Sequence, residues 1–214
     1  MPRAWARHDL FWIRVADWDT FLSARPDIPR YPVLSEWAQR NRPVIVRRPA
    51  PGEIVDGVPF GLPLPPAQGK SRIAGLLPVA CISRRGSPPL LADAARSSPK
   101  AWRHTIDRIV ELSPDARSYG SLAWQDMTGL PYLSSTSDLD VIWRHDDACT
   151  TELRLAQIEK IARAAPMKID GEIINSAGIA VPWRELLLGS PTVIGKRIDG
   201  AGIMTRAEFL TGSG

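Results

Sequence analysis

The chain has 214 residues, 44% of them hydrophobic, which is enough to build one large or two small domains. Its formal net charge is +4, but residues 1–110 carry 17 Lys and Arg against 9 Asp and Glu, whereas residues 111–214 carry 10 against 14. No run of 18 or more apolar residues occurs, and charged residues interrupt the N-terminal apolar segment. We therefore expect a cytoplasmic protein with neither a membrane span nor a secretory leader.

The first half of the chain is rich in proline, since residues 43–90 hold ten of the 20 prolines. This density disfavours long helices and predicts short strands and extended loops. Short helices are expected within 18–24 and 31–40, and strands at 43–48 and 75–83. We predict a mixed α+β domain over residues 1–90, which supplies a wall for substrate or partner.

The second half changes to alternating helices and strands, with a boundary expected within 86–97. Ser98 is expected to cap a helix that begins at Pro99 and ends before Pro114. The elements expected after that helix are a short extended piece (116–120), a short helix (121–127), a loop (130–137), a strand (138–143), a helix (150–165), a strand (167–174) and a final segment with a small tail. Residues 91–214 thus form a second α+β domain with a small mixed sheet flanked by helices.

Two carboxylates open the predicted strand "DLDVIW". Side chains alternate along a strand, so Asp138 and Asp140 point to one face while Leu139 and Val141 point to the core. Acids held this close repel each other unless one is protonated or a divalent cation lies between them. Magnesium suits such a site because it prefers carboxylate and phosphate oxygens. A solvated strand end would also fit an isolated Asp-x-Asp.

Two further features are typical of phosphate chemistry. Gly120 and Ser121 lie between an extended piece and a helix, where glycine lets the backbone approach a phosphate and the first amides of the helix bind an anion. Downstream, Asp170 and Glu172 share one face of the strand in "MKIDGEII", so either could join the acid pair. Together these residues predict metal-assisted phosphoryl transfer.

The segment "YGSLAWQDMTGLPYLSSTSDLDVIW" resembles the nucleotidyltransferase superfamily, whose signature is a Gly-Ser turn, an Asp-x-Asp strand and a third acid on a later strand. With "KIDGEI" and the N-terminal "RHDLFWI", it is similar to the phosphoribosyl-dephospho-CoA transferase family of malonate decarboxylase, over nearly the whole chain. The resemblance implies that Asp138 and Asp140 are Mg²⁺ ligands and Asp170 the third acid. Gly120 and Ser121 would hold a triphosphate.

The resemblance also implies a reaction and its partners. The prosthetic group of 2'-(5''-triphosphoribosyl)-3'-dephospho-CoA would pass to a serine of the malonate decarboxylase acyl-carrier protein, and pyrophosphate would leave. One departure is that 16 residues separate Ser121 from Asp138, more than in the superfamily generally. The extra residues would form a loop over the site, in which Thr136 and Ser137 either contact phosphate or cap a turn.

Basic residues of the first half are further candidates for binding. Lys70 and Arg72 lie in a loop beside glycines and could contact substrate phosphates, or the loop could simply be solvated. A second basic set could receive an acidic carrier protein, and its members are Arg47, Arg48, Arg84 and Arg85. No nucleic-acid reader motif accompanies these scattered charges, so nucleic acid is not an expected partner.

Two other functions fit the same residues. The chain could be a nucleotidyltransferase that uses an ordinary nucleoside triphosphate, or a non-catalytic module that binds the carrier protein. The set of Asp138, Asp140 and Asp170 argues against the second, because a site without a ligand has no use for acids that repel each other.

Overall fold

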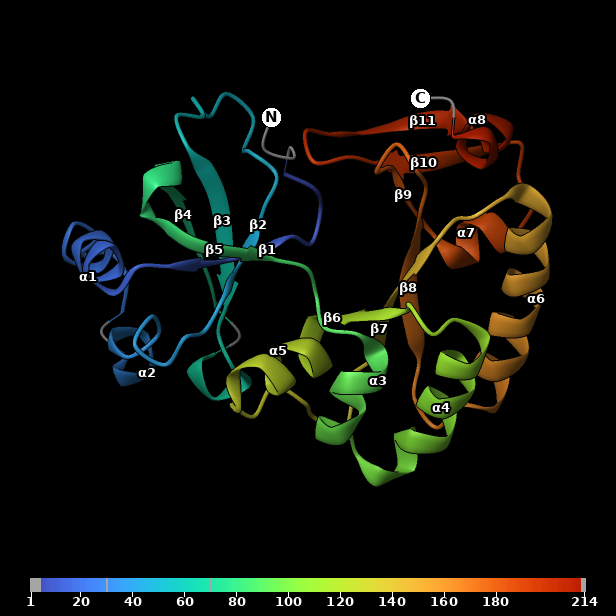
Figure 1. Ribbon diagram of the computed structural model, residues 1–214, viewed down its shortest axis with the longest axis horizontal. Helices are drawn as coiled ribbons and strands as arrows, with labels where there is room; N and C mark the ends of the chain where they lie inside the picture. Colours follow the sequence, from blue (N-terminus) through green and yellow to red (C-terminus); the bar gives the residue numbers. More distant parts are fainter. Residues whose placement is uncertain (1–4, 30, 70, 213–214) are drawn as a thin grey trace. The chain divides into compact units, whose positions relative to one another are not determined.

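The structure is a computed structural model that describes residues 5–29, 31–69 and 71–212. It has a mixed α+β fold with two sheets, which confirms the predicted fold class (Figure 1). The chain divides into two compact units, one comprising residues up to Pro88 together with Met127–Tyr132 and the other comprising Pro89–Asp126 and the residues from Leu133 onward. None of the helices in the described part of the chain has the length and apolarity needed to cross a bilayer.

The first unit contains these elements in chain order: β1 (Leu10–Ile13), α1 (Val15–Ser23), α2 (Pro32–Ser35), β2 (Val44–Val46), β3 (Val58–Pro63), η1 (Pro66–Gln68), β4 (Arg72–Leu77), η2 (Val79–Cys81) and β5 (Ile82–Gly86). The second unit contains these: α3 (Leu91–Ala94), η3 (Ala95–Ser97), η4 (Lys100–Trp102), α4 (Arg103–Leu112), β6 (Arg117–Tyr119), most of α5 (Gly120–Thr128), β7 (Leu139–Arg144), α6 (Ala148–Ala164), β8 (Ile169–Ile174), β9 (Ala180–Pro182), α7 (Trp183–Leu187), β10 (Thr192–Lys196), β11 (Ala201–Thr205) and α8 (Arg206–Thr211).

The first unit is an antiparallel sheet in the order β4-β3-β2-β1-β5. Its core is aromatic: Phe60 meets Phe11 edge-on at 6.0 Å between ring centroids and Phe21 at 5.2 Å. Gly75 on β4 makes room for these rings, since a Cβ there would lie 2.5 Å from Phe60. The indole of Trp18 donates to the Leu34 carbonyl at 2.7 Å. The prolines therefore coexist with a well-packed sheet.

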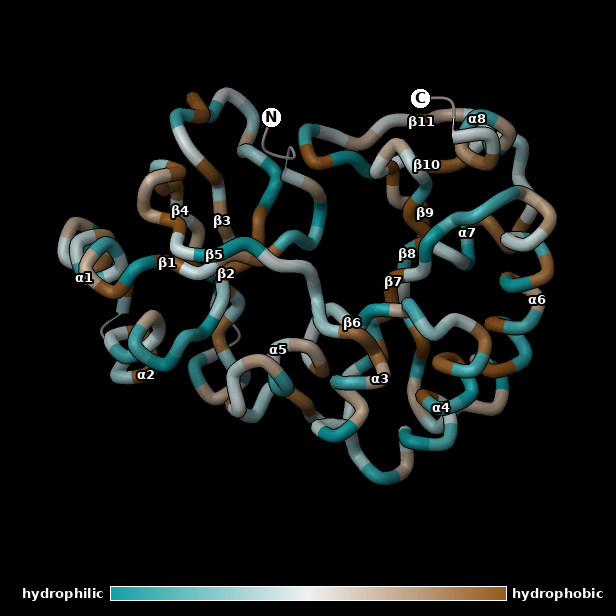
Figure 2. The backbone as a smooth tube through the Cα atoms, in the orientation of Figure 1, coloured by the Kyte–Doolittle hydropathy of each residue, from teal (hydrophilic) through white to brown (hydrophobic). Residues whose placement is uncertain are grey.

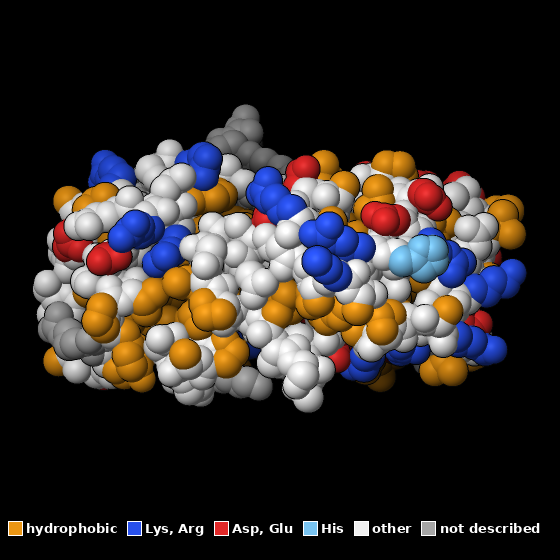
Figure 3. Space-filling model, turned by 90° about the horizontal axis from the view of Figure 1, so that it is seen from below, with side chains coloured by type: hydrophobic (Ala, Val, Ile, Leu, Met, Phe, Trp, Pro, Cys, Tyr) orange, Lys and Arg blue, Asp and Glu red, His pale blue; other side chains and the backbone are white. Residues whose placement is uncertain are grey.

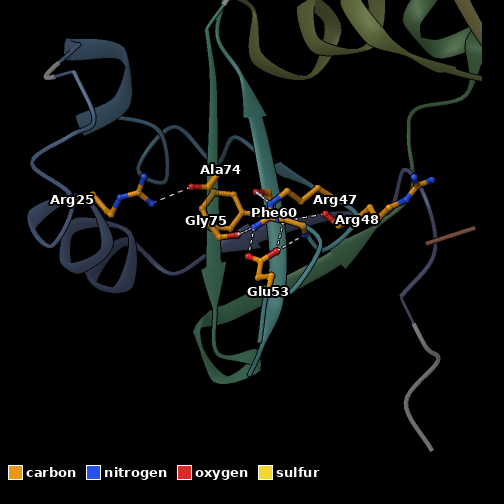
Figure 4. A network of polar contacts seen from close by, with 8 residues as sticks. Arg25, Arg47, Arg48, Glu53, Phe60, Ala74 and Gly75 are labelled. Atoms are coloured by element: carbon orange, nitrogen blue, oxygen red, sulfur yellow. Dashed lines mark hydrogen bonds and ion pairs between the residues drawn. The ribbon is translucent and has the colours of Figure 1, made fainter. Parts of the chain in front are cut away.

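An arginine network ties the strands of this sheet together (Figure 4). Arg47 donates to the two carboxylate oxygens of Glu53 at 2.7 and 2.5 Å and to the Phe60 carbonyl at 3.2 Å. Arg25 donates to the Ala74 carbonyl at 3.1 Å. The bond from Arg47 lowers the pKa of Glu53 to about 2. Arg47, which was predicted from the sequence to contact the carrier, thus links the end of β2 to β3 and to the loop between these two strands.

The second unit is a mixed sheet in the order β11-β10-β9-β8-β7-β6, in which only the β7 and β8 pair, among the described strands, is parallel. The crossover between these two strands is α6, which begins at an Asp147 cap that accepts from the Thr150 amide at 2.9 Å. A parallel pair needs such a long connection. The parallel pairing places the first residues of β7 and β8 side by side.

Helices α4 and α6 cover one face of this sheet (Figure 1), and both alternate between hydrophobic and hydrophilic residues (Figure 2). Leu139, Val141 and Trp143 point from β7 into the core beneath them. Gly171 on β8 makes this possible, because a Cβ there would lie 2.6 Å from Trp143. Alternation along β7 leaves Asp140 on the opposite face of the sheet.

Some predicted elements differ in the structure. The strand expected at 75–83 is broken at Pro78, which has no N–H for a ladder, and a 3-10 turn leads into β5. Ser98 does not cap the next helix, because its hydroxyl donates back to the Ala95 carbonyl at 2.7 Å and η4 precedes α4. The hairpin of β10 and β11 takes the place of the expected small tail.

Residues Met127–Tyr132 belong to the first unit although both flanking segments belong to the second. Tyr132 is 5% exposed and its hydroxyl donates to the Pro63 carbonyl at 2.9 Å. Arg42 donates to the Thr128 carbonyl at 3.3 Å and lies over the ring of Trp37. Met127–Tyr132 overlap the loop that is expected from the sequence to lie over the site. This part of the loop is therefore held within the first unit.

We predict that Tyr132→Phe lowers the stability of the first unit by about 1 kcal/mol, because the Pro63 carbonyl loses its donor while the ring still fills its place. Calorimetric unfolding of the full chain measures the change. Tyr31→Phe is the matched control, because the side chain of Tyr31 is only half-buried. Equal unfolding temperatures for Tyr132→Phe and the parent protein would contradict the prediction.

Candidate active site

The parallel pairing of β7 and β8 brings the predicted acids together. Asp140 lies directly opposite Asp170 in the register, and Asp138 comes two residues earlier on the same face as Asp140. Neighbouring strands lie about 4.7–4.9 Å apart, so the side chains of these register partners are neighbours. All three are partly exposed, with 36% of the Asp138 side chain and 46% of the Asp170 side chain accessible. The three acids thus form one group at the open face of the sheet.

The Gly-Ser turn lies against the same group. Tyr119 on β6 is the register partner of Asp140, and Gly120 follows it with φ of +68° as the chain turns into α5. A Cβ at Gly120 would lie 1.9 Å from the Asp140 Oδ2. Position 120 therefore requires glycine for two reasons, which are its left-handed backbone conformation and its close approach to Asp140. Ser121 follows in the first turn of α5.

Polar contacts at the far end of α5 fix the direction of this helix. Asp126, whose side chain is 4% exposed, accepts from Arg96 at 2.9 Å and from the Ser97 hydroxyl at 2.8 Å. Gln125 donates to the Ser97 carbonyl at 2.8 Å and accepts from the Leu133 amide at 3.1 Å. These bonds hold the helix whose N-terminal turn carries Gly120 and Ser121.

Lys168, which directly precedes β8 two residues before Asp170, bridges two of the acids. Its Nζ lies 2.9 Å from the Asp138 Oδ2 and 3.6 Å from the Asp170 Oδ2. The hydrogen bond to Asp138 is the main cause that raises the pKa of Lys168. The other oxygen of Asp170 accepts from the Gly171 amide at 2.9 Å.

Asp140 is the least solvated acid of the group, and its pKa is raised to about 7. Burial is the largest cause, followed by the charges of Asp170 and Asp138, while Lys168 acts in the opposite direction. A strongly raised carboxyl pKa beside other charged groups is typical of functional sites.

Glu172, the alternative third acid, has another partner. Its side chain is 6% exposed and accepts from Lys196 on β10 at 2.8 Å. In the β7–β8 register it lies opposite Ile142, whereas Asp170 lies opposite Asp140. The structure therefore favours Asp170 over Glu172 as the third acid.

The remaining predicted contacts lie elsewhere or have other partners. The Ser137 hydroxyl accepts from the Ser134 amide at 2.9 Å and Thr136 lies 3.3 Å from the Ser134 hydroxyl, which is the turn-capping alternative. Arg72 is exposed at the start of β4 in the first unit. Lys70 lies outside the described residues. Binding of substrate by Lys70, Arg72 and Ser137 stays a prediction.

Two of the other arginines proposed for a carrier protein, Arg84 and Arg85, lie over aromatic rings. Arg84 lies 3.7 Å from the centroid of Trp12, and Arg85 lies 3.5 Å from that of Trp5 and 3.7 Å from Asp9. Figure 3 shows Lys and Arg side chains in small groups among apolar and acidic ones on the face that it presents. The basic residues are thus dispersed there.

The donor set fits magnesium in chemistry but is not a complete cage. Within the described residues, no three or more His, Cys, Asp or Glu side chains are arranged to hold a metal ion by themselves. Magnesium is usually bound by one or two carboxylates together with phosphate oxygens and waters, and not by an all-protein cage. The facing pair of Asp140 and Asp170 fits that mode.

We predict that Gly120→Ala displaces the Asp140 carboxylate and abolishes the phosphoryl transfer expected from the sequence. Gly129→Ala is the matched control, since Gly129 ends the same helix at φ of +69° but has open space where a Cβ would be. Both variants should lose about 1 kcal/mol of stability from backbone strain, and Gly120→Ala should lose more because its Cβ meets Asp140. Only Gly120→Ala should lose activity, and comparable activity in the two variants would contradict the assigned contact.

The raised pKa of Asp140 predicts a pH-dependent stability in buffer without divalent cations. Because its folded pKa of about 7 exceeds the unfolded value of 3.8, the folded state binds the extra proton between these values. Stability should therefore fall as pH rises from about 4 to above 7, by an amount on the order of 2–4 kcal/mol. Asp140→Asn should remove this fall. Parallel pH profiles of urea unfolding for the two proteins would disprove the assignment.

Comparison with known proteins identifies the family. Residues 6–88 match the model of the phosphoribosyl-dephospho-CoA transferase MdcG N-terminal domain, and residues 90–207 match that of the C-terminal domain. A phosphoribosyl-dephospho-CoA transferase of Bradyrhizobium diazoefficiens is 38% identical over 97% of this chain and 93% of its own length. One of Xanthomonas campestris pv. campestris is 31% identical over 95% and 96%. No solved structure matches the chain significantly. The chain is therefore a transferase that belongs to the phosphoribosyl-dephospho-CoA transferase family.

Proposed function

We propose that this enzyme transfers the prosthetic group of 2'-(5''-triphosphoribosyl)-3'-dephospho-CoA to a serine of the malonate decarboxylase acyl-carrier protein and releases pyrophosphate. The observation that carries the proposal is the meeting of Gly120 with the facing acids Asp140 and Asp170. The family and the names of its relatives support the prosthetic group as the part transferred. The family resemblance supports the carrier.

In the proposed reaction, the serine oxygen of the carrier attacks the phosphorus nearest the ribose. A new serine O–P bond forms, the bond from that phosphorus to the bridging oxygen breaks, and pyrophosphate leaves on the opposite side. The serine proton passes to a carboxylate of the site. The enzyme needs no nucleophile of its own because the carrier provides it.

The residues of the chain would bind and orient the triphosphate. Asp138, Asp140 and Asp170, together with phosphate oxygens of the substrate, would hold Mg²⁺, which neutralises charge on the phosphates when bound. The first amides of α5 and the hydroxyl of Ser121 would receive phosphate oxygens, because the N-terminus of a helix attracts anions. Gly120 lets the backbone at the start of α5 approach Asp140 closely. Positioning and electrostatics account for most of the catalysis in such transfers.

We predict that the purified enzyme with Mg²⁺, the acyl-carrier protein and the triphosphoribosyl precursor increases the carrier mass by one phosphoribosyl-dephospho-CoA group. Intact-protein mass spectrometry measures the product. Replacing the precursor with ATP or another nucleoside triphosphate should leave the carrier unmodified. Modification by a nucleoside triphosphate alone would instead assign the ordinary nucleotidyltransferase reaction.

Acid variants test the residues in the same assay. Asp138→Asn, Asp140→Asn and Asp170→Asn should each reduce the transfer rate at least about 100-fold, the scale of losing a group that stabilises transition-state charge. Asp115→Asn, at an exposed turn of the same unit, is the control and should transfer normally. Full activity of Asp140→Asn would refute the site. Carrier binding without transfer by the parent enzyme would indicate a binding module.

A further inference from the structure

Lys168 is placed so that its ammonium can leave the acids without disturbing the strand. Its backbone carbonyl accepts from the Leu139 amide at 2.9 Å, which fixes the start of β8 against β7. Its side chain is 55% exposed, although its Nζ contacts Asp138 at 2.9 Å. Moving the ammonium therefore requires only rotations of a solvated side chain about a fixed backbone.

The ion pairs of Lys168 are a poor device for stability alone. Pairs this exposed contribute little to the free energy of folding because water and salt screen them. The ion pair of Arg47 in the first unit uses a fork that binds both oxygens of Glu53. Lysine presents a single point charge on a flexible stem, and its donors can change partners. That chemistry suits a cation that is exchanged.

We propose that Lys168 is a positioning residue that stands in for the divalent cation in the free enzyme and changes partners when the metal-bound triphosphate arrives. This inference rests on the proposed function. In the free enzyme the ammonium keeps Asp138 and Asp170 together beside Asp140. When the doubly charged cation binds, the ammonium leaves these carboxylates and pairs with phosphate oxygens, which carry the opposite charge.

Binding of Mn²⁺ to the free enzyme tests the first half of the exchange. Electron paramagnetic resonance should show Lys168→Met binding Mn²⁺ roughly two- to fivefold more tightly than the parent, the factor expected for removing an exposed competing pair. Lys168→Arg should bind it more weakly, because the fork holds both carboxylates. Lys100→Met, which removes an exposed lysine of the same unit, should bind it as the parent does.

Binding of pyrophosphate tests the second half. With Mn²⁺ saturating, calorimetry should show that Lys168→Met binds pyrophosphate at least about threefold more weakly than the parent, because one charge-assisted bond to the phosphates is lost. If Lys168 had a purely structural role, its replacement would not tighten Mn²⁺ binding while weakening pyrophosphate binding. Should Lys168→Met not fold, Lys168→Gln keeps a polar stem and tests the same two affinities.

The two proposals fail differently. If Asp140→Asn binds Mn²⁺ and modifies the carrier as the parent does, the proposed site itself is wrong. If Asp140→Asn loses both but Lys168→Met binds Mn²⁺ no more tightly, or pyrophosphate no more weakly, only the exchange role of Lys168 is overturned. Tighter Mn²⁺ and weaker pyrophosphate binding together support the exchange.

Discussion

The repulsion among three carboxylates on one face of a sheet is the constraint on which the second unit depends. Parallel pairing sets Asp140 against Asp170, and the hydrophobic alternation that buries Leu139 and Val141 leaves the acids nowhere else to point. The fold thus stabilises an unfavourable electrostatic arrangement by its core beneath α4 and α6. Burial and the neighbouring charges of Asp170 and Asp138 together raise the pKa of Asp140, and Lys168 offsets part of this effect.

The first unit uses its charges differently from the second. Its arginines are engaged by Glu53, by backbone carbonyls and by indole rings, so much of the positive charge of the N-terminal half is structural. Proline has no N–H to donate to a neighbouring strand, so this sheet has fewer backbone hydrogen bonds. Hydrogen bonds from side chains to backbone carbonyls add to those that remain. The asymmetry of charge along the sequence is therefore a weaker indicator of anion binding than it first suggests.

Patterns of period two and 3.6 predicted β7, α6 and β8, because each buries a regular face in one core. The acids and the Gly-Ser turn followed from those elements, since alternation determines the direction of a side chain. Sequence could not reveal β3, where prolines mask the period, or the hairpin of β10 and β11. The pairing of Lys168 with Asp138 also escaped it, because the contact joins two strands 30 residues apart.

The stretch Met127–Tyr132 has a bearing on how the enzyme could be divided. The backbone passes from one unit to the other after Pro88, after Asp126 and after Tyr132, so the two units are not consecutive lengths of sequence. If the protein were cut once after Pro88, the C-terminal fragment would carry Tyr132 without the residues that bury it. The N-terminal fragment would lack the side chain that fills this position. Expression of either half alone would therefore require redesign of Met127–Tyr132.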